Sequence, residues 1–356
     1  MSQINCFKSN LDKFATQEIK DVLNTGDLGF GPLVAEFENK MATRTKKKYN
    51  IGLNSASSAA YIIYQMLYEK CGPCRVYTTS LGFVSPVWAA IKNGHEVVFV
   101  DVDENLLFDV WDFQNKFVRD EKTSVVMPVL YGGVTDVPDL HRVSKSLGCL
   151  VVVDSAHCID PKLKSDYTFL SFHPVKPISM ASGGLLSTDI EEHSEYFLRC
   201  RNFGRESIND SYDLVQSGFN FYMNNINAAL GLSSLETCDI EVEKRKSNFE
   251  KLKSSLSELG TFIKHDSGSS YYLATLNLRK DLSSSKMRQF LKSVNIGASY
   301  HYPMIHNTEY YKTNISLKNT EKVEDQLINL PIHHELNSQQ IERIINECIH
   351  YSRSGS

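Results

Sequence analysis

The sequence predicts an α/β fold in which a mostly parallel central sheet carries helices on both faces and a smaller α/β C-terminal domain follows. Two observations predict this fold. Between about residues 49 and 190, short β-rich runs alternate with helical ones, which is the pattern of parallel strands joined by helices. Several of these runs, such as 96–102 and 149–154, are continuously apolar, as expected for strands that are buried on both faces.

Seven strands are expected in this part of the chain. They cover residues 49–53, 75–80, 96–102, 124–130, 149–154, 167–172 and 184–188. Ahead of them, residues 11–26 predict an amphipathic helix that Gly26 ends. Its apolar face is expected to carry Leu11, Phe14, Ile19, Val22 and Leu23.

The C-terminal part begins with helical spacing over residues 224–260, which indicates either one spanning helix or two helices joined near Cys238. Residues 270–278 read as a strand and residues 283–297 as a helix, and Asn337 is placed to cap a final helix. We therefore expect two domains. The large one is predicted to cover residues 1–240 and the small one residues 241–356.

The composition excludes several classes of protein. The chain has 356 residues, 42% of them hydrophobic, and a net charge of -4. There is no basic tail or stripe, which argues against nucleic acid as a partner. No run of 18 apolar residues occurs, so neither a membrane span nor a membrane partner is expected, and the prediction is a cytoplasmic protein.

Eight cysteines are present, and only Cys71 and Cys74 are closely spaced, in the string CGPC. A redox CxxC motif should follow a strand and open a helix, whereas this one follows a helical run and precedes a strand. No second CxxC completes a tetrahedral metal site. The motif is therefore interpreted as a turn with two reduced thiols, and no metal is expected.

Asp154 and Lys176 are the most informative pair. Asp154 ends the apolar run CLVVVD, and Lys176 lies 22 residues later in SFHPVKPISMASGG. Ligands bind beyond the carboxyl ends of parallel strands. Pyridoxal phosphate (PLP) requires an anion at its ring nitrogen and an amine at its aldehyde. The structural alternatives are a helix cap for Asp154 and a solvated lysine for Lys176.

The segment NSASSA follows a predicted strand and opens a predicted helix. Free backbone N–H groups and the helix dipole favour an anion at such a position. Ser57 and Ser58 are therefore candidate phosphate ligands, and Ser171 could add a further hydroxyl group. Ordinary helix capping is the alternative role for these serines.

Seven segments occur in an order that resembles the DegT/DnrJ/EryC1/StrS family of sugar aminotransferases. They are NSASSA, SLGFVSP, VVVDSAH, SFHPVK followed by GG, GFNFYMNNINAALGLSSLE, SYHYPMIH and INLPIH. The resemblance runs from about residue 29 to the last helix. It implies PLP transferase fold type I, in which the bound cofactor alternates between PLP and its amine form, PMP.

The resemblance also implies roles for individual residues. Lys176 would hold PLP covalently and move the proton during catalysis, and Asp154 would keep the pyridine nitrogen protonated. Phe83 would stack on the cofactor ring, with His157 near the 3′ oxygen. Asn220 would reach the phosphate of the neighbouring subunit's cofactor, so a homodimer is expected.

His301 and Tyr302 match the family's segment near the substrate, whereas His173 would only support the lysine loop. The chain departs from the family pattern at Ser182, Tyr222 and Asn225, where the family usually has Glu, Arg and Glu. These departures affect the identity of the substrate more than the use of the cofactor.

The resulting hypothesis is a transamination. L-glutamate would donate its amino group to PLP, and the amine would then pass to the keto group of a nucleotide-linked keto-deoxysugar. A PLP aminotransferase for a cyclitol or other non-sugar ketone retains the same cofactor residues and stays open. A non-catalytic regulator on the same fold is a third hypothesis, and a deoxysugar dehydratase is disfavoured because it would replace the lysine with histidine.

Overall fold

The computed structural model describes residues 2–9, 11, 13–208, 211–311 and 313–354. Within them, the main sheet has seven strands in the order β1-β7-β6-β5-β4-β2-β3. These strands are β1 (Tyr49–Leu53), β2 (Arg75–Thr79), β3 (Glu96–Val100), β4 (Ser124–Met127), β5 (Leu150–Asp154), β6 (Tyr167–Ser171) and β7 (Gly184–Thr188). Only β7 runs antiparallel to its neighbours, β1 and β6. The prediction of a mostly parallel sheet is confirmed.

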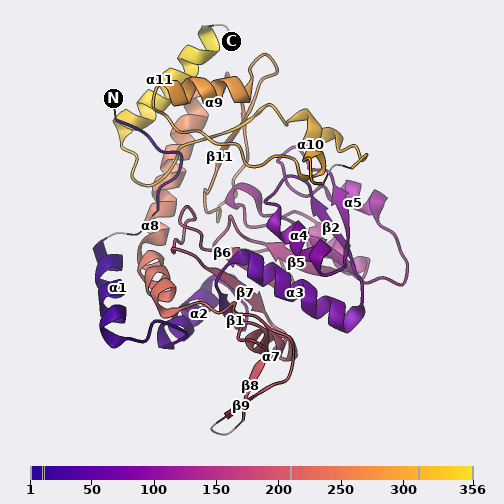
Figure 1. The fold of residues 1–356 in the computed structure, drawn as a ribbon. Coiled ribbons are helices and arrows are strands. Elements are labelled where there is room, and N and C mark those ends of the chain that lie inside the picture. The colour runs from indigo at the N-terminus through magenta and orange to yellow at the C-terminus, as the bar shows by residue number, and fades with distance from the viewer. Residues whose placement is uncertain (1, 10, 12, 209–210, 312, 355–356) are drawn as a thin grey trace.

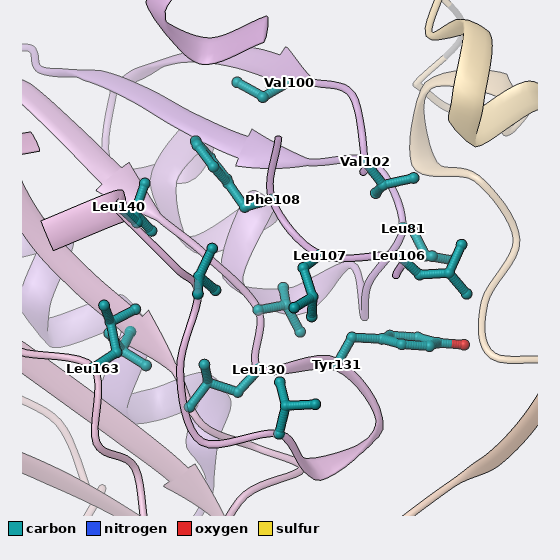
Figure 2. Packing of buried hydrophobic residues seen from close by; sticks show 14 of the residues in the cluster. Leu81, Val100, Val102, Leu106, Leu107, Phe108, Leu130, Tyr131, Leu140 and Leu163 are labelled. Carbon is teal, nitrogen blue, oxygen red and sulfur yellow. The ribbon is translucent and has the colours of Figure 1, made fainter. Parts of the chain in front are cut away.

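Both faces of this sheet are buried, which explains its continuously apolar strands. In β5, Val151 and Val153 join one hydrophobic cluster, whereas Val152 joins another. Successive side chains of a strand point to opposite faces, so the two clusters lie on opposite sides of the sheet. Figure 2 shows part of the first cluster, in which Leu130 and Tyr131 lie below Leu107 and Phe108.

Seven helices accompany the sheet in sequence. They are α1 (Lys13–Thr25), α2 (Pro32–Thr45), α3 (Ala56–Cys71), α4 (Ser85–Lys92), α5 (Val110–Lys116), α6 (Leu140–Ser146) and α7 (Glu191–Cys200). Apolar residues of α3, α4 and α7 pack on one face of the sheet, and those of α5 and α6 on the other. A 3-10 turn, η1 (Tyr131–Gly133), follows β4.

Helix α1 ends where the sequence predicted, next to Gly26, whose φ of 77° suits glycine. Of its predicted apolar face, the side chain of Phe14 lies outside the described residues, and the prediction is wrong at Leu23. Val22 is buried and Ile19 packs against the core, but Leu23 is 54% exposed. The physical reason is the helical period, because Leu23 lies about 100° around the helix axis from Val22. The face of α1 that packs against α8 contains Val22 and the small Ala15, and Leu23 lies outside it.

The C-terminal part is built on α8 (Asn225–Ser255), a single helix with no break at Cys238. Figure 1 shows it running from α1 and α2 to α9 and α11. The remaining elements are β8 (Arg205–Ile208), β9 (Ser211–Leu214), β10 (Gly260–Phe262), β11 (Ala274–Leu278), α9 (Ser284–Ser293), η2 (Ile305–Asn307), α10 (Lys318–Lys322), β12 (Leu327–Leu330) and α11 (Ser338–Arg353). Asn337 caps α11 in a capping box, as predicted.

The two-domain division at residues 240 and 241 stays a prediction. The boundary falls inside α8, and the C-terminal hydrophobic cluster also contains Ile4 from the other end of the chain. Ile4 pairs with Ile296 in a β-bridge. The N-terminal residues are thus packed with the C-terminal part, and Figure 1 shows both termini on the same side of the molecule.

The described helices include none that is long and apolar enough to cross a bilayer. Cys71 closes α3 and Cys74 precedes β2, and both are free thiols in a turn, as expected. Among the described residues, no group of three or more His, Cys, Asp or Glu side chains is arranged to hold a metal ion.

Candidate active site

A cavity of about 310 Å³ lies beyond the carboxyl ends of β5 and β6. This is where a parallel sheet presents free backbone and side-chain groups to a ligand. Most of the residues predicted from the sequence meet there. They are Ser57, Phe83, Asp154, His157, Ser171, Lys176, His301 and Tyr302. These residues come from segments that span most of the chain, so the cavity is a product of the fold.

Asp154 and Lys176 are both buried in the walls of this cavity. Burial raises the pKa of Asp154 to about 6, although a hydrogen bond from the Ala156 N–H and the charge of Lys176 oppose the rise. Burial likewise lowers the pKa of Lys176 to about 7, against the attraction of Asp154. Both groups therefore change charge near neutral pH, which is typical of groups that transfer protons.

The loop that carries Lys176 is held by its own backbone. The Lys176 N–H donates to the His173 carbonyl at 2.8 Å, and the Met180 N–H donates to the Phe172 carbonyl at 2.8 Å. The Ser179 hydroxyl donates to the Lys176 carbonyl at 2.7 Å. These bonds fix the base of the lysine side chain, so its amine enters the cavity from a rigid turn. His173 lines the cavity beside it.

His157 is fixed as a neutral imidazole. Its Nδ1 accepts a hydrogen bond from the Gly132 N–H at 3.2 Å, so the proton lies on Nε2, which is 2.9 Å from the Tyr302 hydroxyl. Burial and the nearby charge of Lys176 hold the pKa of His157 well below its usual value. Because Nε2 donates, the Tyr302 hydroxyl keeps its own proton free to donate to a ligand.

His301 is also neutral, since burial and the charge of Lys176 lower its pKa to about 4. Its Nδ1 lies 3.0 Å from the Ser299 hydroxyl, and its carbonyl accepts a 2.5 Å hydrogen bond from the Tyr131 hydroxyl. Figure 2 shows Tyr131 pointing from the core towards the C-terminal segments. This contact fixes the segment of His301 and Tyr302 against η1, which follows β4 of the large sheet.

The serine-rich segment before α3 differs in part from the prediction. Ser55 is the N-cap of α3, and its hydroxyl accepts from the Ser58 N–H at 3.1 Å. Ser57 lines the cavity and donates to the Ser85 hydroxyl at 2.9 Å. Ser58 does not line the cavity, because its buried hydroxyl donates to Asn54 at 2.5 Å. Ser55, Ala56, Ser57 and Ser171 therefore line the cavity and form the candidate phosphate cup.

Phe83 lies at the mouth of the cavity, 55% exposed, with its ring 5.7 Å from that of Tyr302. An aromatic ring that is half exposed to solvent at the mouth of a cavity has a free face on which another ring can stack. The predicted stacking role for Phe83 is compatible with this position.

Asn220 does not line the cavity of its own chain. It is exposed, and its carbonyl accepts from the Asn54 side chain at 3.1 Å. Tyr222 packs edge-on against Phe30 at 6.2 Å, and Asn225 is buried and donates to the Asp27 carbonyl at 2.8 Å. Of the three departures from the family pattern, only Ser182 lines the cavity.

Tyr272 is a site residue that the sequence reasoning missed. The Lys176 amine lies 4.0 Å above the centre of its ring, and the ring centroid of His157 lies 4.5 Å away. Tyr272 is buried and precedes β11. Its segment reads only as a strand in the sequence, and nothing in that pattern indicates that the chain returns to the lysine loop.

The residues fit PLP on structural grounds. A buried amine and a buried carboxylate line the same cavity of about 310 Å³, as the aldehyde and the ring nitrogen of PLP require. Hydroxyl and backbone N–H groups at the start of α3 suit a phosphate. At Gly184 an added Cβ would lie 2.2 Å from the Ser55 carbonyl carbon, so glycine is required behind this loop.

Comparisons with known proteins found relatives that match nearly the whole chain. A 28% identical relative, the UDP-4-amino-4,6-dideoxy-N-acetyl-beta-L-altrosamine transaminase of Campylobacter jejuni, covers 94% of this chain and 93% of its own length. The spore coat polysaccharide biosynthesis protein SpsC of Bacillus subtilis is 26% identical, with coverage of 94% and 93%.

Among solved structures, Helicobacter pylori PseC, an aminotransferase of pseudaminic acid biosynthesis by its title, superposes with a TM-score of 0.92 at 23% identity. It covers 99% of this chain and 100% of its own. A putative sugar aminotransferase from Streptococcus pneumoniae in its PMP form gives a TM-score of 0.89 at 23% identity, with coverage of 99% and 98%. These likenesses confirm the fold.

The model of the DegT/DnrJ/EryC1/StrS aminotransferase family matches residues 9–348. The match spans the sheet, the cavity and nearly all of the C-terminal part, in agreement with the resemblance seen in the sequence. The chain belongs to the DegT/DnrJ/EryC1/StrS aminotransferase family.

Proposed function

We propose that this protein is a cytoplasmic, PLP-dependent aminotransferase that moves an amino group from L-glutamate to the keto group of a nucleotide-linked keto-deoxysugar. The observation that carries the proposal is the buried pair of Asp154 and Lys176 in one cavity at the strand ends. Two similar proteins are named as a UDP-4-amino-sugar transaminase and a UDP-4-amino-4-deoxy-L-arabinose--oxoglutarate aminotransferase, which supports this substrate class.

When bound, PLP supplies an electron sink next to the carbon that gains or loses the amine. Lys176 performs two tasks that its pKa near 7 permits. In its neutral form the amine is the nucleophile that holds the cofactor, and in its charged form it returns a proton. Asp154 would keep a proton on the ring nitrogen of the bound cofactor, and the charge pair would stabilise the carboxylate that burial alone disfavours.

The other residues orient and enclose the reactants. Phe83 would cover one face of the cofactor ring, and Ser57 and Ser171 would hold its phosphate. Tyr302, oriented by His157, donates to an oxygen of the cofactor or the substrate. His301 lines the substrate side of the cavity. Fixing these groups before the substrate arrives supplies the orientation on which catalysis depends.

A homodimer completes the site in this proposal. Asn220 is exposed and is not among the residues that line its own cavity. The neighbouring segment exposes Tyr212 (54%), Leu214 (64%) and Phe219 (42%). Apolar side chains exposed together favour burial against another molecule. Figure 1 shows the β8–β9 hairpin projecting from the body of the molecule. A second copy covers this surface and receives Asn220 at its phosphate cup.

The first experiment follows the absorption band of the lysine-bound cofactor. The purified protein with PLP should show this band, L-glutamate should bleach it, and a keto-deoxysugar linked to UDP, GDP or dTDP should restore it. Lys176→Met should lack the band. Absence of the band in the unmodified protein would refute the proposal. Restoration by a cyclitol ketone but by no nucleotide-linked sugar would instead support the non-sugar hypothesis.

The second experiment tests the shared site with hybrid dimers of Lys176→Met and Asn220→Ala chains, separated by different affinity tags. Each homodimer should be inactive. If Asn220 serves the partner's cofactor, one of the two sites in the hybrid contains both native residues, and about half of the native activity per dimer returns. An inactive hybrid would show that Asn220 serves its own subunit.

A further inference from the structure

The cavity is small for a site that has to hold PLP together with a nucleotide-linked sugar. Its volume is about 310 Å³, at the low end of ligand pockets. The nucleoside of the substrate must therefore lie outside the mouth of the cavity, on whatever surface adjoins it.

Helix α4 leads from the mouth onto that surface. Its first residues, Ser85 and Pro86, line the cavity. Trp88 lies three residues after Ser85, on the same side of the helix, and a rise of 1.5 Å per residue carries it about 4.5 Å beyond Ser85 along the axis. Trp88 is 42% exposed. A solvent-exposed indole ring thus lies within one helical turn of the cavity-lining residues Ser85 and Pro86.

A second exposed ring stands against the first. Tyr310 is 76% exposed, and its ring centroid lies 6.1 Å from that of Trp88, with the ring planes at 76°. Two rings at nearly a right angle form a corner in which a third flat ring can stack on one and meet the other edge-on.

The segment that carries Tyr310 is fixed to the large sheet without any ligand. The Ile305 N–H donates to the Ser80 carbonyl at 3.1 Å, and the Ser80 hydroxyl lies 2.6 Å from Nδ1 of buried His306. Tyr311 packs edge-on against Phe99 at 5.3 Å. Because Ser80 follows β2 and precedes α4, both aromatic side chains are anchored at the same strand end. The corner is therefore preformed.

We propose that Trp88 and Tyr310 form a subsite that stacks on the nucleobase of the substrate. A flat base recognises exposed aromatic faces at about 1–3 kcal/mol per stacked ring, with little preference among bases. This inference rests on the proposed function, because it places the nucleoside of the same substrate. It adds that the enzyme should hold a nucleoside diphosphate even when no sugar is attached.

The chain offers a direct spectroscopic test, because it contains two tryptophans, Trp88 and Trp111. Trp111 lies on α5, is 72% exposed and does not line the cavity. Trp111→Phe leaves Trp88 as the sole indole, and Trp88→Phe leaves Trp111 as the matched control. We expect UDP and dTDP to quench the Trp88 emission of the PLP-loaded enzyme with a saturable titration, and pyrophosphate and ribose 5-phosphate to cause no such change.

Steady-state kinetics give an independent readout. Trp88→Leu and Tyr310→Ala should each raise KM for the nucleotide-linked sugar about tenfold, equivalent to ~1.4 kcal/mol, while KM for L-glutamate changes less than about twofold. A larger effect on glutamate would indicate a general distortion of the site and would contradict the subsite.

Three results overturn the inference. In the first, UDP quenches Trp111 as strongly as Trp88, and in the second, pyrophosphate reproduces the effect of UDP. In the third, the Trp88 emission responds to protein concentration and not to nucleotide, which would mean that a second copy of the chain covers Trp88 and Tyr310. Failure of the proposed function is separate, since it appears as a cofactor band that L-glutamate does not bleach, whatever the behaviour of Trp88.

Discussion

Replacing Lys176 with methionine should stabilise the protein before PLP is bound. Methionine has a similar length and no charge, so it keeps the packing near Tyr272 while removing a buried amine. The pKa of Lys176 is about 7 in the folded protein, against 10.5 for the unperturbed side chain. Between these two values the unfolded chain binds more protons than the folded one, so the stability of the native apoprotein rises with pH in this window.

The size of the effect follows from the shift. Each pH unit below 10.5 at which the lysine must lose its proton on folding lowers the free energy of unfolding by about 1.36 kcal/mol. Burying Lys176 therefore lowers the stability of the apoprotein by about 3 kcal/mol at pH 8 and by about 1 kcal/mol at pH 10. At pH 8 Asp154, with its pKa near 6, is already ionised, and the lysine is mostly neutral, so little attraction between the two is lost. Lys176→Met should therefore gain stability at pH 8, and the gain should shrink towards pH 10.

The assay is urea unfolding of the apoprotein at pH 8, 9 and 10, with the free energy of unfolding extrapolated to zero urea. Protein concentration is kept constant because a dimer unfolds in a concentration-dependent way, and a reductant protects the free cysteines. Lys92→Met, at an exposed position of α4, is the matched control and should change the free energy by less than about 0.5 kcal/mol. A gain that is absent at pH 8, or equal at all three pH values, refutes the reasoning.

Three further predictions concern the same cavity. Covalent attachment of PLP should accelerate as pH rises and level off with a midpoint near 7, because only neutral Lys176 attacks; stopped-flow absorbance measures it, and a flat profile contradicts it. Gly184→Ala should weaken PLP affinity at least about tenfold, because the added Cβ collides with the backbone of Ser55 at the start of α3. Gly29→Ala is the control and should leave the affinity unchanged, because no atom lies within 4 Å of the added Cβ. Equilibrium dialysis measures both affinities. Tyr302→Phe should cost about 1 kcal/mol in urea unfolding through the lost partner of His157, and unchanged stability and turnover would argue against the hydrogen bond.

The positions and limits of the strands along the chain were predictable because burial on both faces leaves a continuous apolar run. Each of the seven predicted strands agrees with the structure to within three residues, from β1 at Tyr49–Leu53 to β7 at Gly184–Thr188. The direction of β7 was not predictable, because a strand's hydrophobicity is the same whichever way it runs. The error at Leu23 has a related cause, since the sequence of a helix indicates which residues are apolar but not which of them a neighbouring helix will cover.

The same limit applies to the site. Asp154, Lys176, Ser57 and Ser171 could be named because short motifs place them at strand ends, where a parallel sheet binds ligands. Ser58 could not be separated from Ser57, because a rotation of about 100° between successive helical residues decides which hydroxyl faces the cavity. Here Ser58 turns inward to Asn54.

The sequence by itself determined the sheet, the family resemblance and the pairing of a carboxylate with a lysine, because these depend on local patterns of apolar and motif residues. Tertiary structure alone decided that Tyr272 lies under the Lys176 amine, that His157 and Tyr302 share a hydrogen bond, and that Tyr310 meets Trp88. These contacts join residues more than 90 positions apart in the chain. Such distances are set by how the C-terminal segments pack against the sheet, which no local pattern encodes.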